Sequence, residues 1–381
     1  MPAALGKLRI LDFSRVLAGP FATMMLADLG ASVVKVERPG AGDDTRSWGP
    51  PYDARGVATY FESVNRNKDS LALDLTEPAD LAHARRLAAQ ADVVVENFRP
   101  GVMDRLGLGY EQLRADNPGL IYCSITGFGT GEGAELPGYD LLVQALGGLM
   151  SITGVPDREP QKVGVALVDV LAGLFATVGI LTALTHRSAG GEGQRVEVDL
   201  LSSLLAALVN QGSAYTAGGT VPTRMGNQHP SIAPYELFGC QDGELVIAVG
   251  NERQFGALCA VIDAPQLAED SRFVTNAARV EHRSELRDEL ELRLSRRRAA
   301  DWASALTAAR VPAGVVNDVA GAFALAQQLG LEPVIEIPYA DGTTIALTRN
   351  PIRLSATPAT YRCAPPPLGG PAQAGFSNTN R

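Results

Sequence analysis

Residue types that build metal, redox and disulfide sites are scarce in this sequence. Its 381 residues include four cysteines and four histidines. The cysteines lack the spacing of a zinc site or a redox pair, and the histidines form no pair of metal ligands. We therefore expect no structural metal, and a reducing, cytoplasmic compartment. The cysteines are Cys123, Cys240, Cys259 and Cys363, and the histidines are His83, His186, His229 and His282.

Positive charge is also in short supply. Lys and Arg number 33 against 42 Asp and Glu, and the formal net charge is −9. Proteins that bind nucleic acid or a membrane surface by general electrostatic attraction need the opposite balance, so both classes of partner are disfavoured. The first residues, MPAALGKLRILDF, lack the apolar segment of a signal peptide and lead directly into an expected strand.

Long apolar runs are rare, and one stands out: VGVALVDVLAGLFATVGILTAL, from Val163 to Leu184. It is long enough to raise the question of a membrane span. Asp169 lies inside it, however, three glycines interrupt it, and no second apolar run accompanies it. We expect instead a short apolar strand over Val163–Val168 that turns into a buried helix at Asp169.

Two interpretations of Asp169 follow from this run. The first is an N-cap of a core helix, which the run by itself favours because capping is a common role of Asp. The second is an ionised carboxylate nucleophile, held at a helix start in a dry pocket. A carboxylate in apolar surroundings is costly to ionise unless something specific stabilises it.

The first half of the chain alternates between expected strands and helices, which predicts an α/β fold with a large doubly wound, Rossmann-like domain. The connection after the first strand, SRVLAGP, lacks the G-x-G-x-x-G dinucleotide fingerprint, so a nicotinamide dehydrogenase is the weakest function considered. Tyr139–Met150 is expected to be a helix. The expected strands are Lys7–Phe13, Ala31–Glu37, Ser70–Leu75, Asp92–Glu96, Leu120–Ile125 and Gln194–Leu200.

The length of the chain and the change in its sequence pattern from Met225 onward predict two domains. Residues 1–213 form the large α/β domain, 214–224 a linker, and 225–318 a smaller α+β domain. Residues 319–381 return to the large domain and end in a loosely ordered tail from Ala364. Two Asp-Gly pairs, Asp242-Gly243 and Asp341-Gly342, predict β-hairpins.

Basic residues gather between positions 38 and 105, several of them at expected strand ends. In an acidic protein, such residues at the carboxyl ends of strands indicate a phosphorylated ligand. Each one singly fits a solvated surface charge equally well. They are Arg38, Arg46, Arg55, Arg66, Lys68, Arg99 and Arg105.

Several stretches together carry a family resemblance. They are LRILDFSRVLAGPFATMMLADLGASVVKVERPGAGDDTR, YFESVNRNKDSLALDL, ADVVVENFRPGVMDRLGLGYEQL, ITGFG, GYDLLVQALGGLMSITG and the apolar run above. With them the sequence resembles the family III coenzyme A transferases, the group that holds formyl-CoA transferase, carnitine-CoA transferase and the α-methylacyl-CoA racemases. The match runs almost continuously from residue 8 to about residue 210 and continues more loosely through GNQHPSIAPYELF and VPAGVVNDV.

The resemblance implies that Asp169 is the nucleophile of a CoA transferase that acts on an acyl-CoA and a small carboxylic acid. Aspartyl anhydride and aspartyl-CoA thioester intermediates would form, with CoA as substrate and no permanently bound cofactor. It also implies an interlocked homodimer. Tyr139 and Asp140 would lie beside the reacting centre, with Trp48 close. The residues implied to contact CoA are Val16, Leu17, Ala18, Arg38, Leu73, Asp74, Leu75, Thr76, Asn97, Phe98, Arg99 and Arg105.

Two departures from the family pattern bear on the reaction. The racemase branch has a histidine at the place of Tyr139, and a tyrosine, which ordinarily ionises near pH 10, is a poor base at neutral pH. This favours a transferase over the alternative, an α-methylacyl-CoA racemase or epimerase. Leu17 replaces the glutamine of formyl-CoA transferase, which argues against formyl and oxalyl substrates.

The acid substrate is less defined. The motif GNQHPSIAPYELF resembles branches that use dicarboxylates such as succinate or glutarate, with succinyl-CoA as a donor. Arg224 or His229 is then a candidate for holding a distal carboxylate. A regulator that binds acyl-CoA without turnover is a further alternative, disfavoured because Asp169 is intact.

Overall fold

The computed structural model describes residues 3–369 and residue 376, which form two compact units. The large unit contains the described parts of Met1–Leu149, Lys162–Thr220 and Glu332–Arg381, and the small unit contains Met150–Gln161 and Val221–Leu331. The unit boundary at 331 differs from the sequence-based one at 318. Most of the expected loosely ordered tail from Ala364 lies outside the described residues.

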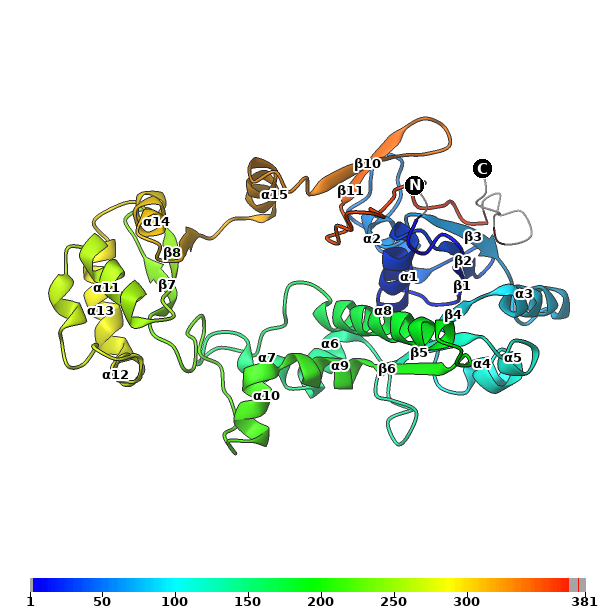
Figure 1. Ribbon diagram of the computed structural model, residues 1–381, viewed down its shortest axis with the longest axis horizontal. Helices are drawn as coiled ribbons and strands as arrows, with labels where there is room; N and C mark the ends of the chain where they lie inside the picture. The colour runs from blue at the N-terminus through cyan, green and yellow to red at the C-terminus, as the bar shows by residue number, and fades with distance from the viewer. Residues whose placement is uncertain (1–2, 370–375, 377–381) are drawn as a thin grey trace. The chain divides into compact units, whose positions relative to one another are not determined.

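A six-stranded parallel sheet forms the centre of the large unit, with the strand order β3-β2-β1-β4-β5-β6 (Figure 1). This mixed α/β architecture and all six expected strands are confirmed. The chain order reverses between β1 and β4, and doubly wound sheets bind their ligands at that point. The strands are β1 (Arg9–Asp12), β2 (Ser32–Glu37), β3 (Lys68–Ala72), β4 (Val93–Glu96), β5 (Ile121–Thr126) and β6 (Arg195–Asp199).

Alternating side chains give the sheet two apolar faces. Ile10 and Val93 belong to the core on one face, which α1 and α8 cover, and Leu11 and Val94 belong to the core on the other, which α3, α4 and α5 cover. The helices are α1 (Ala18–Asp28), η1 (Asp44–Ser47), α2 (Thr59–Ser63), α3 (Pro78–Gln90), α4 (Val102–Arg105), α5 (Tyr110–Asp116), α6 (Asp140–Leu146), α8 (Leu167–Ser188), α9 (Leu200–Ala207) and α10 (Val209–Thr216).

The expected strand over Val163–Val168 is wrong, because α8 already begins at Leu167. The Val163 N–H donates to the side chain of Gln144 at 2.9 Å instead of to a neighbouring strand, and Val165 is 62% exposed. Apolar residues in this segment therefore do not mark a buried strand. The expected helix Tyr139–Met150 is also divided, into α6 and α7 (Leu149–Ile152), because Gly147-Gly148 interrupts it and Gly148 has a φ of +85°.

Helix α8 is, among the described residues, the one helix whose length and apolar composition would allow it to cross a membrane. One side of it is packed in the core of the large unit through Ala172, Ala176 and Ile180. Core helices of α/β proteins pass the same test of length and composition. The packing thus explains this half of the apolar run, whereas Leu174, Phe175 and Val178 remain exposed on the other side.

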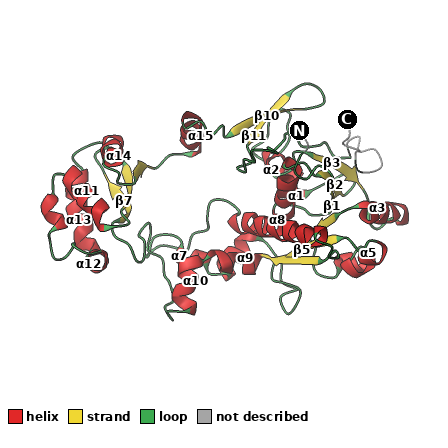
Figure 2. Ribbon diagram, in the orientation of Figure 1, coloured by secondary structure: helices red, strands yellow, loops and turns green. Residues whose placement is uncertain are grey.

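The small unit has an antiparallel sheet and a layer of helices (Figure 2). Both hairpins expected at Asp-Gly pairs are present: β7 and β8 flank Asp242-Gly243 in this unit, and β10 and β11 flank Asp341-Gly342 in the large unit. The elements of the small unit are β7 (Tyr235–Gly239), β8 (Glu244–Ala248), α11 (Glu252–Val261), η2 (Pro265–Ala268), α12 (Asn276–Glu281), α13 (Arg283–Leu294), α14 (Ala299–Ala308), β9 (Ala313–Val315) and α15 (Val319–Gln328). The second hairpin consists of β10 (Val334–Pro338) and β11 (Thr344–Thr348).

Candidate active site

A cavity of about 330 Å³ lies at the carboxyl edge of the parallel sheet, and Asp169 lines it. Most of its wall comes from the segments that follow β1, β4, β5 and β6, because the carboxyl ends of parallel strands meet at one edge of the sheet. Of the residues singled out in the sequence, the cavity brings together Val16, Leu17, Ala18, Asn97, Phe98, Arg99, Tyr139 and Asp169.

Asp169 is the third residue of α8, and its side chain does not cap the helix. The cap comes from Asp140, at the start of α6, whose Oδ2 accepts the N–H groups of Val168 at 2.7 Å and of Asp169 at 3.3 Å. The N-cap interpretation of Asp169 is therefore wrong. With the helix N–H groups already satisfied, the Asp169 carboxyl has no hydrogen bond or ion pair to any other described residue and is available to a ligand.

The surroundings of Asp169 favour its neutral form. Burial, and after it the neighbouring Asp140 carboxylate, raises the pKa of Asp169 to about 7. A carboxylate with a pKa near neutrality is a stronger nucleophile than an ordinary one and is still ionised in part at pH 7. Such a shift at a cavity wall is typical of a functional site.

Tyr60, on α2, is a neighbour of this centre that the sequence did not single out. Burial raises its pKa to about 12, and the Asp169 carboxylate adds to the effect, so Tyr60 keeps its hydroxyl proton near the aspartate. Its ring packs edge-on against Trp48, with the ring centroids 5.5 Å apart. Trp48 does not line the cavity itself. The fold brings Tyr60 close to both Trp48 and Asp169, and no spacing in the sequence indicates that Tyr60 lies there.

A second cavity, of about 490 Å³, adjoins the first in the large unit. Arg15 and Phe98 line both cavities, and the Arg15 guanidinium stacks on the Phe98 ring with its carbon 4.7 Å from the centroid. Arg15, which carried no expectation, is thus shared between the two spaces. The singled-out residues in the second cavity are Arg38, Leu73, Asp74, Leu75, Thr76, Phe98 and Arg105.

The arginines that line the second cavity differ in whether they form an ion pair. Arg38 is paired with Asp44 at 2.5 Å on the surface, whereas the guanidinium groups of Arg15 and Arg105 have no ion pair to another described residue. Burial, and next the positive charge of Arg38, lowers the pKa of Arg15. Unpaired guanidinium groups beside an apolar space fit a ligand that carries both phosphates and an aromatic ring.

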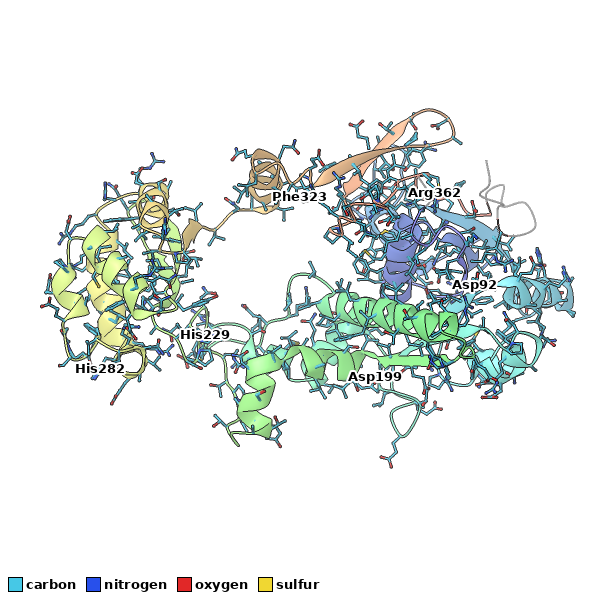
Figure 3. All side chains as sticks on the ribbon, in the orientation of Figure 1. Asp92, Asp199, His229, His282, Phe323 and Arg362 are labelled. Atoms are coloured by element: carbon cyan, nitrogen blue, oxygen red, sulfur yellow. The ribbon has the colours of Figure 1, made fainter. Side chains whose placement is uncertain are left out.

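His229 belongs to the small unit, whereas Asp169 belongs to the large unit (Figure 3). Its Nδ1 accepts the N–H of Ser231 at 3.1 Å, and its ring lies against Tyr235 with the centroids 5.2 Å apart. Arg283 donates to the carbonyl oxygens of His229 and Pro230, which fixes the loop from the other side. Arg224 instead donates to the carbonyl oxygens at positions 155 and 156.

No group of three or more His, Cys, Asp or Glu side chains close enough to hold a metal ion occurs in the part of the chain that the structure describes. The residues at the two cavities fit a reaction in which a carboxylate is the nucleophile. That reaction class needs an activated carbonyl and no redox group.

Comparison with known proteins identifies the family. Residues 5–371 match the family model "CoA-transferase family III". The chain is 44% identical over 371 residues, 96% of this chain and 93% of the other, to succinate–glutarate CoA-transferase of Agrobacterium fabrum. It is 43% identical over 350 residues, 91% of this chain and 88% of the other, to acetyl-CoA:oxalate CoA-transferase of Acetobacter aceti.

Solved structures agree with the sequence relatives. A CAIB/BAIF family protein from Brucella suis superposes with a TM-score of 0.86 at 44% identity, and 97% of each chain is covered. The protein Rv3272 of Mycobacterium tuberculosis superposes with a TM-score of 0.87 at 34% identity, over 96% of this chain and 97% of that one. The resemblance noted in the sequence is thereby confirmed: this chain belongs to CoA-transferase family III and is a CoA transferase that acts on acyl-CoA and carboxylic acids.

Proposed function

We propose that Asp169 is the nucleophile and carries the acyl group and then CoA as covalent intermediates. The observation that carries this proposal is the state of its side chain: it lines the cavity, has no partner among the described residues and has a pKa raised to about 7. A structural carboxylate would be paired or capping, and here Asp140 already performs the capping.

The reaction runs through four acyl transfers. The Asp169 carboxylate attacks the thioester carbonyl, the C–S bond breaks, and CoA leaves as thiolate from a mixed anhydride. The thiolate attacks the aspartyl carbonyl, which releases the first acid and leaves an aspartyl-CoA thioester. The acceptor carboxylate attacks this thioester, the C–S bond breaks, and CoA leaves as thiolate from a second anhydride. The thiolate then attacks the carbonyl of the acceptor's acyl group, which forms the new acyl-CoA and releases the Asp169 carboxylate. No net proton or electron is transferred.

The second cavity is our proposed site for the nucleotide end of CoA. Leu73 to Thr76 supply its wall for the adenine. Arg15 and Arg105, which form no ion pair to another described residue, supply positive charge for the phosphates, and Arg38 also lines the cavity. Asn97 and Phe98 then lie along the path from this cavity to Asp169, because Phe98 lines both cavities.

For the acids, we propose dicarboxylates, with succinyl-CoA as a donor, because relatives of similar sequence are named for succinate and glutarate. His229 is the better candidate than Arg224 for a distal carboxylate. Its Nδ1 is an acceptor, so in the neutral ring Nε2 carries the proton and can donate to a carboxylate oxygen. The guanidinium of Arg224 already donates to two carbonyl groups.

We also propose a homodimer, interlocked as the resemblance implies. Exposed apolar side chains on consecutive helices of the large unit support it, since a solvated surface rarely carries so many. They are Leu174, Phe175 and Val178 on α8, Leu205 on α9, and Val209 and Tyr215 on α10. The cytoplasmic location stays a prediction.

The racemase alternative is not favoured. Tyr139 lines the cavity beside Asp169, where that branch would need a histidine base. The relatives cited above are named as transferases.

The test is mass spectrometry of the Asp169 peptide after incubation with succinyl-CoA and hydroxylamine. An anhydride or thioester should be captured as the hydroxamate at Asp169, and the Asp169→Asn variant should show neither hydroxamate nor CoA transfer to glutarate. CoA transfer by the wild type with an unmodified Asp169 peptide, or transfer by the Asn variant, would contradict the proposal.

A further inference from the structure

The segment Ser14–Leu17, between β1 and α1, has an unfavourable backbone conformation. Val16 has a φ of +67°, in the left-handed region that a β-branched residue rarely adopts. Arg15, Val16 and Leu17 of this segment line the cavity that holds Asp169. Its conformation therefore decides the shape of the wall that faces the nucleophile.

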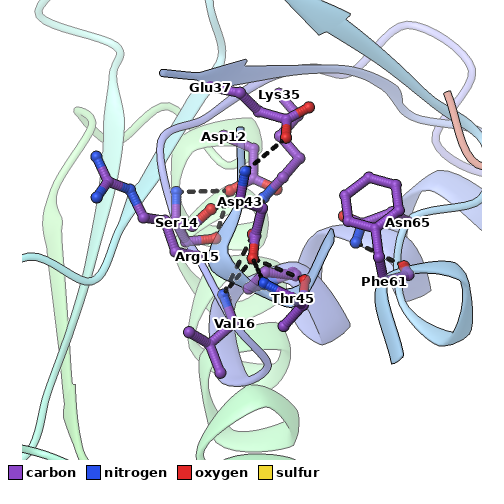
Figure 4. A network of polar contacts seen from close by, with 12 residues as sticks. Asp12, Ser14, Arg15, Val16, Lys35, Glu37, Asp43, Thr45, Phe61 and Asn65 are labelled. Atoms are coloured by element: carbon purple, nitrogen blue, oxygen red, sulfur yellow. Dashed lines mark hydrogen bonds and ion pairs between the residues drawn. The ribbon is translucent and has the colours of Figure 1, made fainter. Parts of the chain in front are cut away.

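A buried ion pair holds this conformation (Figure 4). Both carboxylate oxygens of Asp43 accept the Val16 N–H, at 3.2 and 3.3 Å, and Asp43 pairs with Lys35 Nζ at 2.9 Å. The side chains of Lys35 and Asp43 have no exposed surface. Lys35 Nζ also donates to the Ser14 carbonyl at 2.7 Å, so the pair binds the segment both at Val16 and two residues before it.

Two further side chains complete the attachment. Asn97 accepts the Arg15 N–H and donates to the Arg15 carbonyl, both at 2.8 Å, and Asp12 accepts the Ser14 N–H at 2.9 Å. Gly19 allows the close approach, because a Cβ there would lie 2.2 Å from Ser14 Oγ. Side chains from β1, from β2 and from the loops after β2 and β4 thus bind backbone N–H and carbonyl groups of Ser14, Arg15 and Val16.

From this arrangement we infer that Lys35 and Asp43 are positioning residues of the transfer reaction. They hold Val16 in its left-handed conformation, so that the Arg15–Ala18 wall has the shape that binds CoA beside Asp169. Neither side chain lines the cavity, so they act through Val16 and Ser14. The inference rests on the proposed function, in which this wall contacts CoA.

The test compares Asp43→Asn with Asp28→Asn. Asp28 is a matched control: it too belongs to a fully buried ion pair, with Arg66 at 2.6 Å, but it lies at the other end of α1 and does not contact the segment. Both variants lose a buried charge and should lose thermal stability. Only Asp43→Asn should bind CoA at least ten-fold more weakly in calorimetry and raise KM for succinyl-CoA by the same factor.

A second variant separates positioning from plain destabilisation. Glycine adopts a φ of +67° without strain, so Asp43→Asn/Val16→Gly should bind CoA more tightly than Asp43→Asn, although it carries one more substitution. If Asp43 only stabilised the fold, the losses of CoA affinity caused by the two substitutions would add or grow, and the double variant would bind CoA no more tightly than Asp43→Asn. Thr45→Val is the milder variant to use if Asp43→Asn does not fold, because it deletes only the hydroxyl that donates to Asp43 at 2.7 Å. We expect Thr45→Val to lower CoA affinity as well, by a smaller factor than Asp43→Asn.

The outcomes are distinguishable. Wild-type protein that does not bind CoA would overturn the proposed function and the inference with it. Wild-type protein that binds CoA, together with an unchanged affinity in folded Asp43→Asn or equal losses in Asp43→Asn and Asp28→Asn, would overturn the inference alone.

Discussion

At the scale of single residues, the carboxyl of Asp169 makes the transfer rate depend on pH. Its pKa is raised to about 7, and attack on a thioester needs the ionised form. We therefore expect kcat/KM for succinyl-CoA to rise with pH through about 7, from roughly a tenth of its maximum at pH 6 to near the maximum at pH 8. Steady-state rates between pH 5 and 9 measure this. A flat profile over that range would contradict the raised pKa.

Asp140 offers a way to move this profile. Its negative charge is, after burial, the second cause of the raised pKa of Asp169. Asp140→Asn removes the charge while leaving an amide oxygen that can accept the Val168 N–H, so the midpoint of the profile should fall by about 0.5–1 pH unit. Asp140→Ala also removes the cap and should in addition lower stability by about 1 kcal/mol. A midpoint that stays near 7 in a folded Asn variant would show that burial alone sets the pKa.

The sequence revealed some members of the site and hid others for a physical reason. Asp169 stood out because an acid inside an apolar run is conspicuous. The family resemblance placed Asp140 beside the reacting centre, but its role as the cap of α8 was hidden, since a cap supplied from 29 residues away leaves no local pattern. Tyr60 was hidden for the same reason, because only the fold brings α2 near the start of α8.

At the scale of the elements, the close approach of α8 to α1 fixes where Asp169 stands relative to the Arg15–Ala18 wall. Gly173 allows it, because a Cβ there would lie 2.6 Å from the Ala18 carbonyl oxygen. Gly173→Ala should push the two helices apart, lower the free energy of unfolding by about 1–3 kcal/mol and reduce kcat at least ten-fold. Thermal melts and transfer kinetics measure both effects.

Gly256→Ala is the matched control for that substitution. Gly256 lies inside α11 of the small unit, and a Cβ there meets no atom within 4 Å. Alanine is the better helix former, so this variant should raise the free energy of unfolding by about 0.5–1 kcal/mol and keep the wild-type kcat. If Gly173→Ala behaved like Gly256→Ala, the close helix contact would not position Asp169.

The elements themselves were predictable where a pattern has one physical meaning. Strands of a parallel sheet are buried on both faces and appear as short apolar runs, which located all six. The run from Val163 to Val168 has the same composition, yet it is an exposed loop and the first turn of a helix. Apolar composition cannot distinguish burial within one chain from an exposed apolar surface, and the sequence-based interpretation failed at that point.

At the scale of the whole molecule, the exposed apolar side of α8 predicts that the protein is a dimer. Leu174, Phe175 and Val178 face away from the core that Ala172 and Ala176 enter. Covering them by a second copy would remove apolar area from water at about 25 cal/mol per Å². We therefore expect a dimer in detergent-free buffer, and we expect Val178→Lys to shift it toward monomers and to lower CoA transfer.

Light scattering after size exclusion measures the mass, and Leu292→Lys is the matched control. Leu292 is a similarly exposed apolar residue, 61% against 61% for Val178, but it lies on α13 of the small unit. The control should remain dimeric, because its side chain is not part of the apolar side of α8. A wild-type monomer that partitions into lipid vesicles would mean that α8 meets a membrane, since its length and composition also allow that. A wild-type dimer that survives Val178→Lys would place the interface on another surface.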